Sequence, residues 1–254
     1  MADRDLLIVV GLTGVGKSTT LEALLKVVPG ARLLPNRRAL ADALVLPEAQ
    51  RLEGEPPQPV RDRLERFRLS ARYRRAHPGG MARALERFLA SEGSRAAGAP
   101  LALFDNLRGE DEVAYAVGAF PDARFVVLEA PAAVRVLRLA GRRDTFDRVG
   151  SGGAASDAAR DVTSAADHDG LLARLQRVDG MASLADLSRL AADAAGLEPD
   201  AVEAGARVVA GESLHYDPVG AWSRLEPLPE HRRLRLDTAQ LTPQQVVGRL
   251  ASWL

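Results

Sequence analysis

Cysteine is absent from this chain of 254 residues. That absence excludes disulfide bonds, zinc sites built on thiolates and a cysteine nucleophile. An excess of one charge is also missing, because 34 lysines and arginines balance 34 aspartates and glutamates. With no net charge the chain has no global attraction to nucleic acid or to an anionic membrane, so any anion must be bound by a local group of residues.

Long apolar runs are missing too. No stretch approaches the roughly 20 apolar residues that a membrane-spanning helix needs. The start, Met1 to Asp5, is too acidic, and the apolar run after it too short, for a signal peptide. We therefore expect a cytoplasmic protein with no membrane partner. Trp222 and Trp253 are too few and too far apart to suggest stacking on bases.

One motif near the N-terminus carries specific chemistry. Residues Gly11 to Ser18 fit the phosphate-loop pattern G-x-x-x-x-G-K-[ST] in full, between an apolar run and a helical pattern. Backbone N–H groups of such a loop point at phosphate oxygens, Lys17 reaches the terminal phosphates, and the Ser18 hydroxyl can ligate Mg²⁺. The alternative is a glycine-rich turn that only connects strand and helix. We expect ATP, with GTP left open, to contact Gly11, Thr13, Gly14, Val15, Gly16, Lys17, Ser18 and Thr19.

Apolar runs separated by helical patterns predict the fold. This alternation indicates an α/β protein with a five-stranded parallel sheet flanked by helices. Together with the phosphate-loop motif after the first strand, it predicts the P-loop NTPase fold. A capping box at Thr242, followed by proline at the first helical position, opens the final helix. The predicted strands are Leu6–Val10, Arg32–Leu34, Leu101–Phe104, Arg124–Leu128 and Leu234–Leu236.

The chain between the last two predicted strands is long. Residues 151–156 have the small, polar composition of a loop, and helical patterns without a strand candidate follow to about residue 205. We therefore expect a core of residues 1–150 and 229–254 and a mostly helical insertion of residues 151–228, whose role the sequence leaves open.

A carboxylate closes the third predicted strand. Asp105 follows Phe104 at what would be the carboxyl edge of the sheet, where ligands of open α/β sheets bind. There it could hold Mg²⁺ through water or accept the proton of an attacking hydroxyl. The alternative is a turn or helix-capping aspartate, because Asp105 to Gly109 also has the composition of a turn.

Arginines follow the fourth predicted strand. Arg135, Arg138 and Arg142 share one face if residues 131–143 form a helix, and Arg143 comes next. We interpret the segment as a lid in which Arg138 and Arg142 neutralise a transferred phosphoryl group and Arg143 contacts the nucleotide. The alternative is a solvated basic face paired with nearby carboxylates.

A second basic run lies between the second and third predicted strands. It could grip a phosphorylated acceptor or a nucleic-acid backbone. Equally, it could be a solvent-exposed helix whose positive charge is partly balanced by Asp62 and Glu65. Its arginines are Arg61, Arg63, Arg66, Arg68, Arg72, Arg74 and Arg75.

Two segments resemble a known family. Gly11 to Thr19, and the order of strand, acidic turn, helix, strand and arginines from Phe104 to Arg143, resemble the P-loop kinases of the nucleoside monophosphate kinase superfamily. Within that group they are similar to dephospho-coenzyme A kinase and adenylate-kinase-like proteins. The resemblance implies phosphoryl transfer from ATP to a small molecule such as a nucleoside, nucleotide or coenzyme precursor, with Lys17 and the lid arginines stabilising the transferred group. Residues 157–228 depart from it.

Two other functions remain open. The first is a regulatory NTPase that binds a protein partner through the helical insertion; the lack of an Asn-Lys-x-Asp motif and of a water-orienting glutamine after Asp105 counts against it. The second is a polynucleotide kinase, against which the balanced net charge counts. Neither the acceptor nor the oligomeric state is specified by the sequence.

Overall fold

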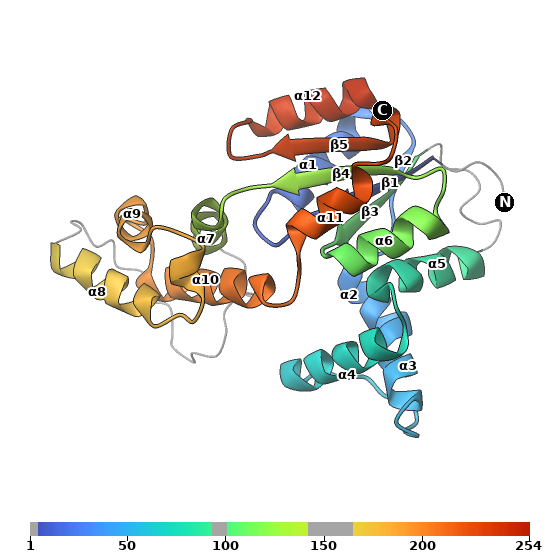
Figure 1. The fold of residues 1–254 in the computed structure, drawn as a ribbon, viewed down its shortest axis with the longest axis horizontal. Helices are drawn as coiled ribbons and strands as arrows, with labels where there is room; N and C mark the ends of the chain where they lie inside the picture. The colour runs from blue at the N-terminus through green and yellow to red at the C-terminus, as the bar shows by residue number, and fades with distance from the viewer. Residues whose placement is uncertain (1–4, 93–100, 142–164) are drawn as a thin grey trace. The chain divides into compact units, whose positions relative to one another are not determined.

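The computed structural model describes residues 5–92, 101–141 and 165–254 (Figure 1). Contacts divide the chain into two compact units. The first comprises Met1–Leu12, Gly16–Glu129 and Tyr216–Leu254, and the second comprises Thr13–Val15 and Ala130–His215. The predicted division into a core and a separate insertion stays a prediction.

The first unit contains a parallel sheet of five strands in the order β2-β3-β1-β4-β5. This confirms the α/β class and the sheet. β3 continues three residues beyond its predicted end, because it keeps pairing with β1 past a bulge. Asp105 therefore lies in a strand and not in a turn. The strands are β1 (Asp5–Val10), β2 (Ala31–Leu33), β3 (Leu101–Leu107), β4 (Arg124–Glu129) and β5 (Arg233–Asp237).

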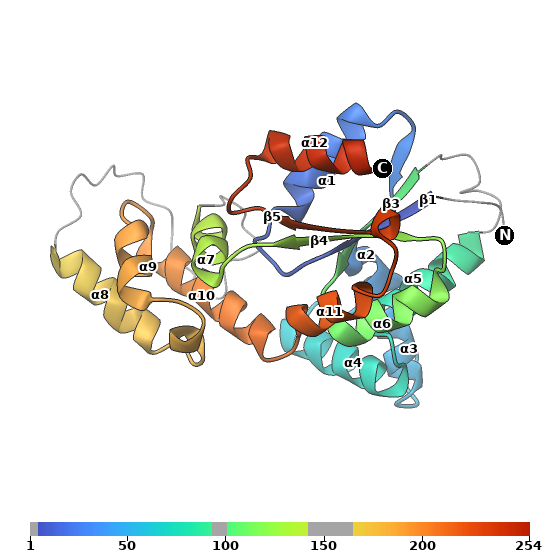
Figure 2. The ribbon, with the colours of Figure 1, turned by 45° about the horizontal axis from the view of Figure 1, so that its top comes forward.

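Helices cover both faces of this sheet (Figure 2). On one face lie α1 (Lys17–Val27) and α12 (Pro243–Trp253). On the other lie α5 (Gly80–Glu92), α6 (Glu110–Ala119) and α11 (Pro218–Leu225). This double covering explains why the central strand reads as an unbroken apolar run, since Leu7, Ile8 and Val9 are fully buried.

The capping box predicted for the last helix is confirmed. The Thr242 side chain accepts a hydrogen bond from the Gln245 N–H, and the Gln245 side chain accepts one from the Thr242 N–H. Each bond satisfies a backbone donor that the first helical turn leaves without a partner.

Further helices connect β2 to β3. They are α2 (Arg37–Leu40), the π-helical turn η1 (Ala41–Val45), α3 (Leu46–Arg51) and α4 (Arg63–Ala76). α2 and α3 were not predicted from the sequence. Asn36 begins α2 by accepting a hydrogen bond from the Ala39 N–H, and Asp62 begins α4 in the same way.

The second unit is built from helices around a core of its own. Val136, Leu175, Met181, Leu190 and Val209 are among its buried side chains. No strand occurs in the described part of residues 130–215; for residues up to about 205 the sequence predicted helical patterns without a strand. The helices are α7 (Ala132–Ala140), α8 (Ala165–Gln176), the 3-10 turn η4 (Met181–Ser183), α9 (Leu187–Asp193) and α10 (Pro199–Ser213). A second 3-10 turn, η5 (Glu230–Arg232), precedes β5 in the first unit.

Among the helices that the structure describes, none combines the length and hydropathy needed to cross a bilayer.

Candidate active site

The phosphate loop connects β1 to α1. Gly14 and Gly16 have φ of 88° and 91°, which side chains rarely adopt, and α1 begins directly after Gly16. The buried Lys17 ammonium donates hydrogen bonds to the carbonyl oxygens of Gly11 (2.9 Å) and Leu12 (2.8 Å). Two carbonyl groups of the loop therefore bind the Lys17 ammonium, the group that the motif predicts to contact phosphate.

The polar residues after Lys17 differ in exposure. Ser18 and Thr19, both predicted to contact nucleotide, are exposed in the first turn of α1, whereas Thr20 is buried. An exposed hydroxyl at Ser18 can approach a phosphate-bound cation. Val15, which was also predicted to contact the nucleotide, has a buried side chain, so only its backbone is suited to that contact.

Asp105 lies beside the phosphate-loop strand. It pairs with Val9 of β1 near the carboxyl ends of both strands, where ligands of open parallel sheets bind. Its Oδ1 atom is buried and has no hydrogen-bond partner in the described structure. Burial raises the pKa of Asp105, and the nearby charges of Lys17 and Arg108 oppose that rise. Lys17 and Asp105, predicted from separate segments, thus act on one another.

The oxygen atoms present suit magnesium bound together with a nucleotide. Among the described residues no three histidine, aspartate or glutamate side chains gather into a metal site. Mg²⁺ in nucleotide sites takes one or two protein oxygens and completes its shell with phosphates and water. The exposed Ser18 hydroxyl and the unpartnered Asp105 oxygen could supply those protein ligands.

A bulge follows Asp105. The register with β1 shifts so that Val10 pairs with Leu107, and Asn106 adopts a positive φ of 101°, the only residue other than glycine to do so in the described chain. The Asn106 side-chain oxygen accepts a hydrogen bond from Arg108 Nε (2.8 Å), and its carbonyl accepts one from Arg37 (3.1 Å). The bulge therefore directs two arginines to the end of β3.

Three arginines surround the ring of Tyr216. The guanidinium carbons of Arg37, Arg74 and Arg108 each lie 5.8 Å from the ring centre. Arg37 also donates to both carboxylate oxygens of the buried Glu112, at 2.8 and 2.7 Å. Burial alone would raise the pKa of Glu112, but the charge and hydrogen bonds of Arg37 outweigh it and the pKa is lowered. Of these three arginines, Arg37 is thus paired with Glu112, and Arg108 is the one whose charge acts on Asp105.

Arg37 and Tyr216 were not identified from the sequence. Asn36 before the arginine pair of residues 37 and 38 is an N-cap signal that could have revealed α2. Tyr216 stands in a connection between helices, where no pattern indicates that it meets residues so far away in the chain.

In the second unit, the middle of the phosphate loop contacts α7 and α10. Thr13 bonds to Glu212 and Arg135, and Arg138 donates to the Gly14 carbonyl at 3.3 Å. Arg135 is buried in an ion pair with Glu212. Glu212 was not identified from the sequence, and no local pattern singles it out. Arg142 and Arg143 lie outside the described residues, so the lid stays a prediction.

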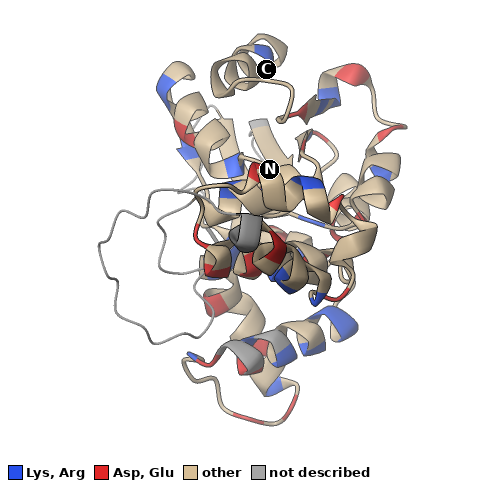
Figure 3. Cartoon of the chain, turned by 90° about the vertical axis from the view of Figure 1, so that its left-hand side faces the viewer, with Lys and Arg blue, Asp and Glu red and all other residues tan. Residues whose placement is uncertain are grey.

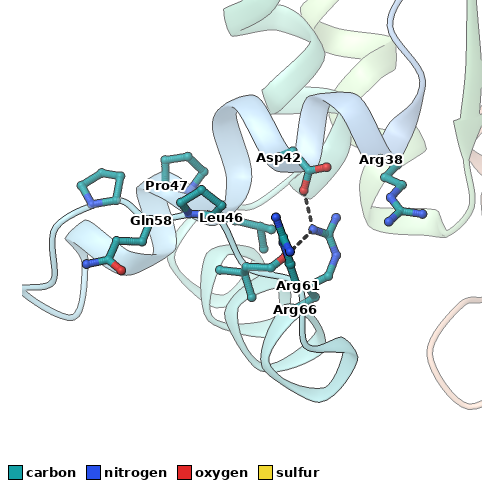
Figure 4. A pocket seen from close by; sticks show the side chains of 10 residues that line it. Arg38, Asp42, Leu46, Pro47, Gln58, Arg61 and Arg66 are labelled. Carbon is teal, nitrogen blue, oxygen red and sulfur yellow. Dashed lines mark hydrogen bonds and ion pairs between the residues drawn. The ribbon is translucent and has the colours of Figure 1, made fainter.

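Three of the seven arginines of the second basic run bind protein groups. Arg68 binds Glu53 and Glu65, and Arg72 donates to the Leu52 carbonyl. Arg66 binds Asp42 at 2.5 Å (Figure 4). In the charge-coloured view of the chain, basic and acidic residues are interspersed (Figure 3). These pairs favour the interpretation of a solvated helix at Arg66, Arg68 and Arg72.

A cavity of about 780 Å³ lies next to the Arg66–Asp42 pair (Figure 4). Its lining comes from α2, η1, α3, the segment before α4 and α4 itself. It is lined by Arg38, Asp42, Leu46, Pro47, Pro57, Gln58, Pro59, Val60, Arg61 and Arg66.

Comparisons with known proteins add a distant structural likeness. No protein-family model matches the chain, and no curated protein matches it. Among solved structures, it is similar to a sugar kinase from Janibacter sp. HTCC2649 determined without ligand, with 15% identity and a TM-score of 0.47. The match covers 99% of this chain and 94% of the other. A likeness this distant assigns neither activity nor substrate to the present chain.

Proposed function

We propose that this protein is an ATP- and Mg²⁺-dependent kinase that phosphorylates a hydroxyl group of a small molecule. The observation that carries the proposal is the buried, unpartnered Oδ1 atom of Asp105 beside the phosphate-loop strand. Leaving a buried carboxylate oxygen without a hydrogen bond is costly, so such groups cluster where a ligand supplies the partner. A strand end next to a phosphate loop is where that ligand would bind.

The residues suggest the following reaction. The hydroxyl oxygen of the acceptor attacks the γ-phosphorus of ATP, its proton passes to Asp105, and the bond from the γ-phosphorus to the bridging oxygen breaks as ADP leaves. Lys17 balances charge on the phosphate oxygens. Mg²⁺ would be held by the Ser18 hydroxyl and, through a water molecule, by Asp105, so that the carboxylate stays available as the proton acceptor. The ion would neutralise charge on the β- and γ-phosphates. Arg138, Arg142 and Arg143 keep their predicted roles as part of this proposal.

The surroundings of Tyr216 favour an acceptor with an anionic group. Arg74 and Arg108 come from different segments and converge on this ring, where Arg37 is held by the buried Glu112. Arg108 is also close enough to influence the pKa of Asp105. Guanidinium groups bind carboxylates and phosphates well because their donors match the geometry of two oxygens. A compound with a hydroxyl and a nearby carboxylate or phosphate would suit both parts of the site.

The proposal is tested by measuring ADP formation with Mg²⁺ and ATP against nucleosides, nucleotides, coenzyme precursors and sugars, each with and without an anionic group. We expect acceptor-dependent turnover that Lys17→Ala abolishes. Asp105→Asn should lower kcat by roughly 10²- to 10⁴-fold, because it removes the proton acceptor. Asp111→Asn changes an exposed aspartate of α6 and serves as the matched control.

Other results would contradict the kinase. Slow, Lys17-dependent ADP formation indifferent to every acceptor would favour the regulatory NTPase. Phosphorylation of oligonucleotides, with binding that weakens steeply as salt rises, would favour the polynucleotide kinase. Full activity in Asp105→Asn would exclude the assigned role of this carboxylate.

A further inference from the structure

The phosphate loop is fixed at Thr13 by a ring of hydrogen bonds. The Thr13 N–H donates to Glu212 Oε2 at 2.9 Å, and its hydroxyl donates to Glu212 Oε1 at 2.5 Å. Arg135 completes the ring, because its Nε donates to the Thr13 carbonyl at 2.7 Å and another of its nitrogens donates to Glu212 Oε2 at 2.6 Å. All three polar groups of Thr13 therefore have partners on α7 and α10.

This ring is buried. Arg135 is 4% exposed and Glu212 is 7% exposed, so the ion pair between them is shielded from water. Ionic hydrogen bonds in such surroundings are short, directional and costly to break. The side chains that hold Thr13 are themselves fixed by one another, and this rigidity is what a supporting residue needs if it is to set the geometry of a binding loop.

The next residue, Gly14, is positioned by close packing against α7. A Cβ atom on Gly14 would lie 3.0 Å from the Arg135 Cβ and carbonyl oxygen, so the loop backbone packs directly on α7. The φ of 88° at Gly14 is also one that side chains rarely adopt. Backbone position at Thr13 and Gly14 is thus determined by α7 and α10 as well as by the motif itself.

We infer that Glu212 is a positioning residue for nucleotide binding, acting through Thr13 and Arg135 on the phosphate loop. This inference rests on the proposed function, because it assumes that the loop binds nucleotide. Loop N–H groups bind phosphate well only when they already point at its oxygens. Glu212 supplies that order from the last turn of α10, about 200 residues away in the sequence. Arg135 is consequently a supporting residue and not a transition-state arginine.

The inference is tested with four single variants, one double variant and ADP as the probe. Glu212→Gln keeps the shape of the side chain but removes its charge and turns an amino group toward the donors. Thr13→Val removes the hydroxyl, and Thr13→Ser keeps it. Glu203→Gln is the matched control, because Glu203 also lies on α10 and forms ion pairs, with Arg174 and Arg207, that do not involve the loop.

The dissociation constant of ADP is measured by calorimetry well below the melting temperature of each variant. We expect Glu212→Gln and Thr13→Val to weaken ADP binding by roughly tenfold or more, whereas Glu203→Gln binds as the wild type does. Thr13→Ser, which keeps the hydroxyl, should retain more affinity than Thr13→Val. The KM for ATP should rise in parallel. The double variant of Thr13→Val and Glu212→Gln should bind little worse than either single variant, because both break the same ring.

Each contrary result has a distinct meaning. If Glu212→Gln lowers the melting temperature but binds ADP like the wild type, Glu212 only stabilises the fold and the inference is overturned. Equal losses in Glu212→Gln and Glu203→Gln would overturn it as well, since any damage to α10 would then suffice. If the wild-type protein itself binds no ADP, the proposed function fails together with the inference.

Discussion

At the scale of single residues, the site depends on backbone conformations that few residues tolerate. Asn106 has a φ of 101°, and this conformation turns its carbonyl toward Arg37 and its side chain toward Arg108. Asparagine enters this region more readily than most residues, but strain there still costs energy and is found most often at functional sites. Asn106 therefore helps to position Arg37 and Arg108.

A pair of variants separates the backbone effect from the side-chain effect. Asn106→Ala and Asn106→Gly both remove the hydrogen bond with Arg108, but only alanine places a Cβ atom at positive φ. We expect Asn106→Ala to be less stable than Asn106→Gly by about 1 kcal/mol in urea denaturation. Equal stability would mean that the bulge relaxes and that the positive φ is not required.

At the scale of elements, some features could be predicted from local sequence patterns and others arise only from contacts between distant segments. The buried strands, the phosphate loop and the capped final helix were predictable, because each has a signal within about ten neighbouring residues. Asp105 was predictable as a strand end, yet the bulge after it was not, since it arises from pairing with β1. Glu212 and Tyr216 gain their roles only through contacts with distant segments, and α2 was missed because four residues show no periodicity.

The contact between α7 and α10 gives a testable contrast between two glycines of one helix. A Cβ atom on Gly205 would lie 3.1 Å from the Val136 carbonyl oxygen, whereas one on Gly211 meets nothing within 4 Å. Alanine is favoured over glycine in helices by about 1 kcal/mol. We expect Gly211→Ala to raise the melting temperature and Gly205→Ala to leave it unchanged or lower it. A similar rise in both would show that α7 and α10 separate easily.

At the scale of the whole molecule, the balance of charge governs behaviour in solution. The formal net charge is zero at pH 7, and the sequence pI is about 6.9. Proteins without net charge repel one another least, so they associate most readily near that pH. We expect solubility, followed by light scattering across pH, to be lowest near neutrality and to recover on either side. A minimum far from pH 7 would show that surface patches outweigh net charge.

Lys17 has a consequence for the heat of binding. Its ammonium already donates hydrogen bonds to two carbonyls of its own loop. A phosphate that draws the ammonium away replaces those bonds with others, so the measured enthalpy is a difference between two bonded states. A nucleotide can therefore bind tightly here while releasing little heat. For the same reason, the affinity lost on Lys17→Ala understates the strength of the contact between the lysine and the phosphate.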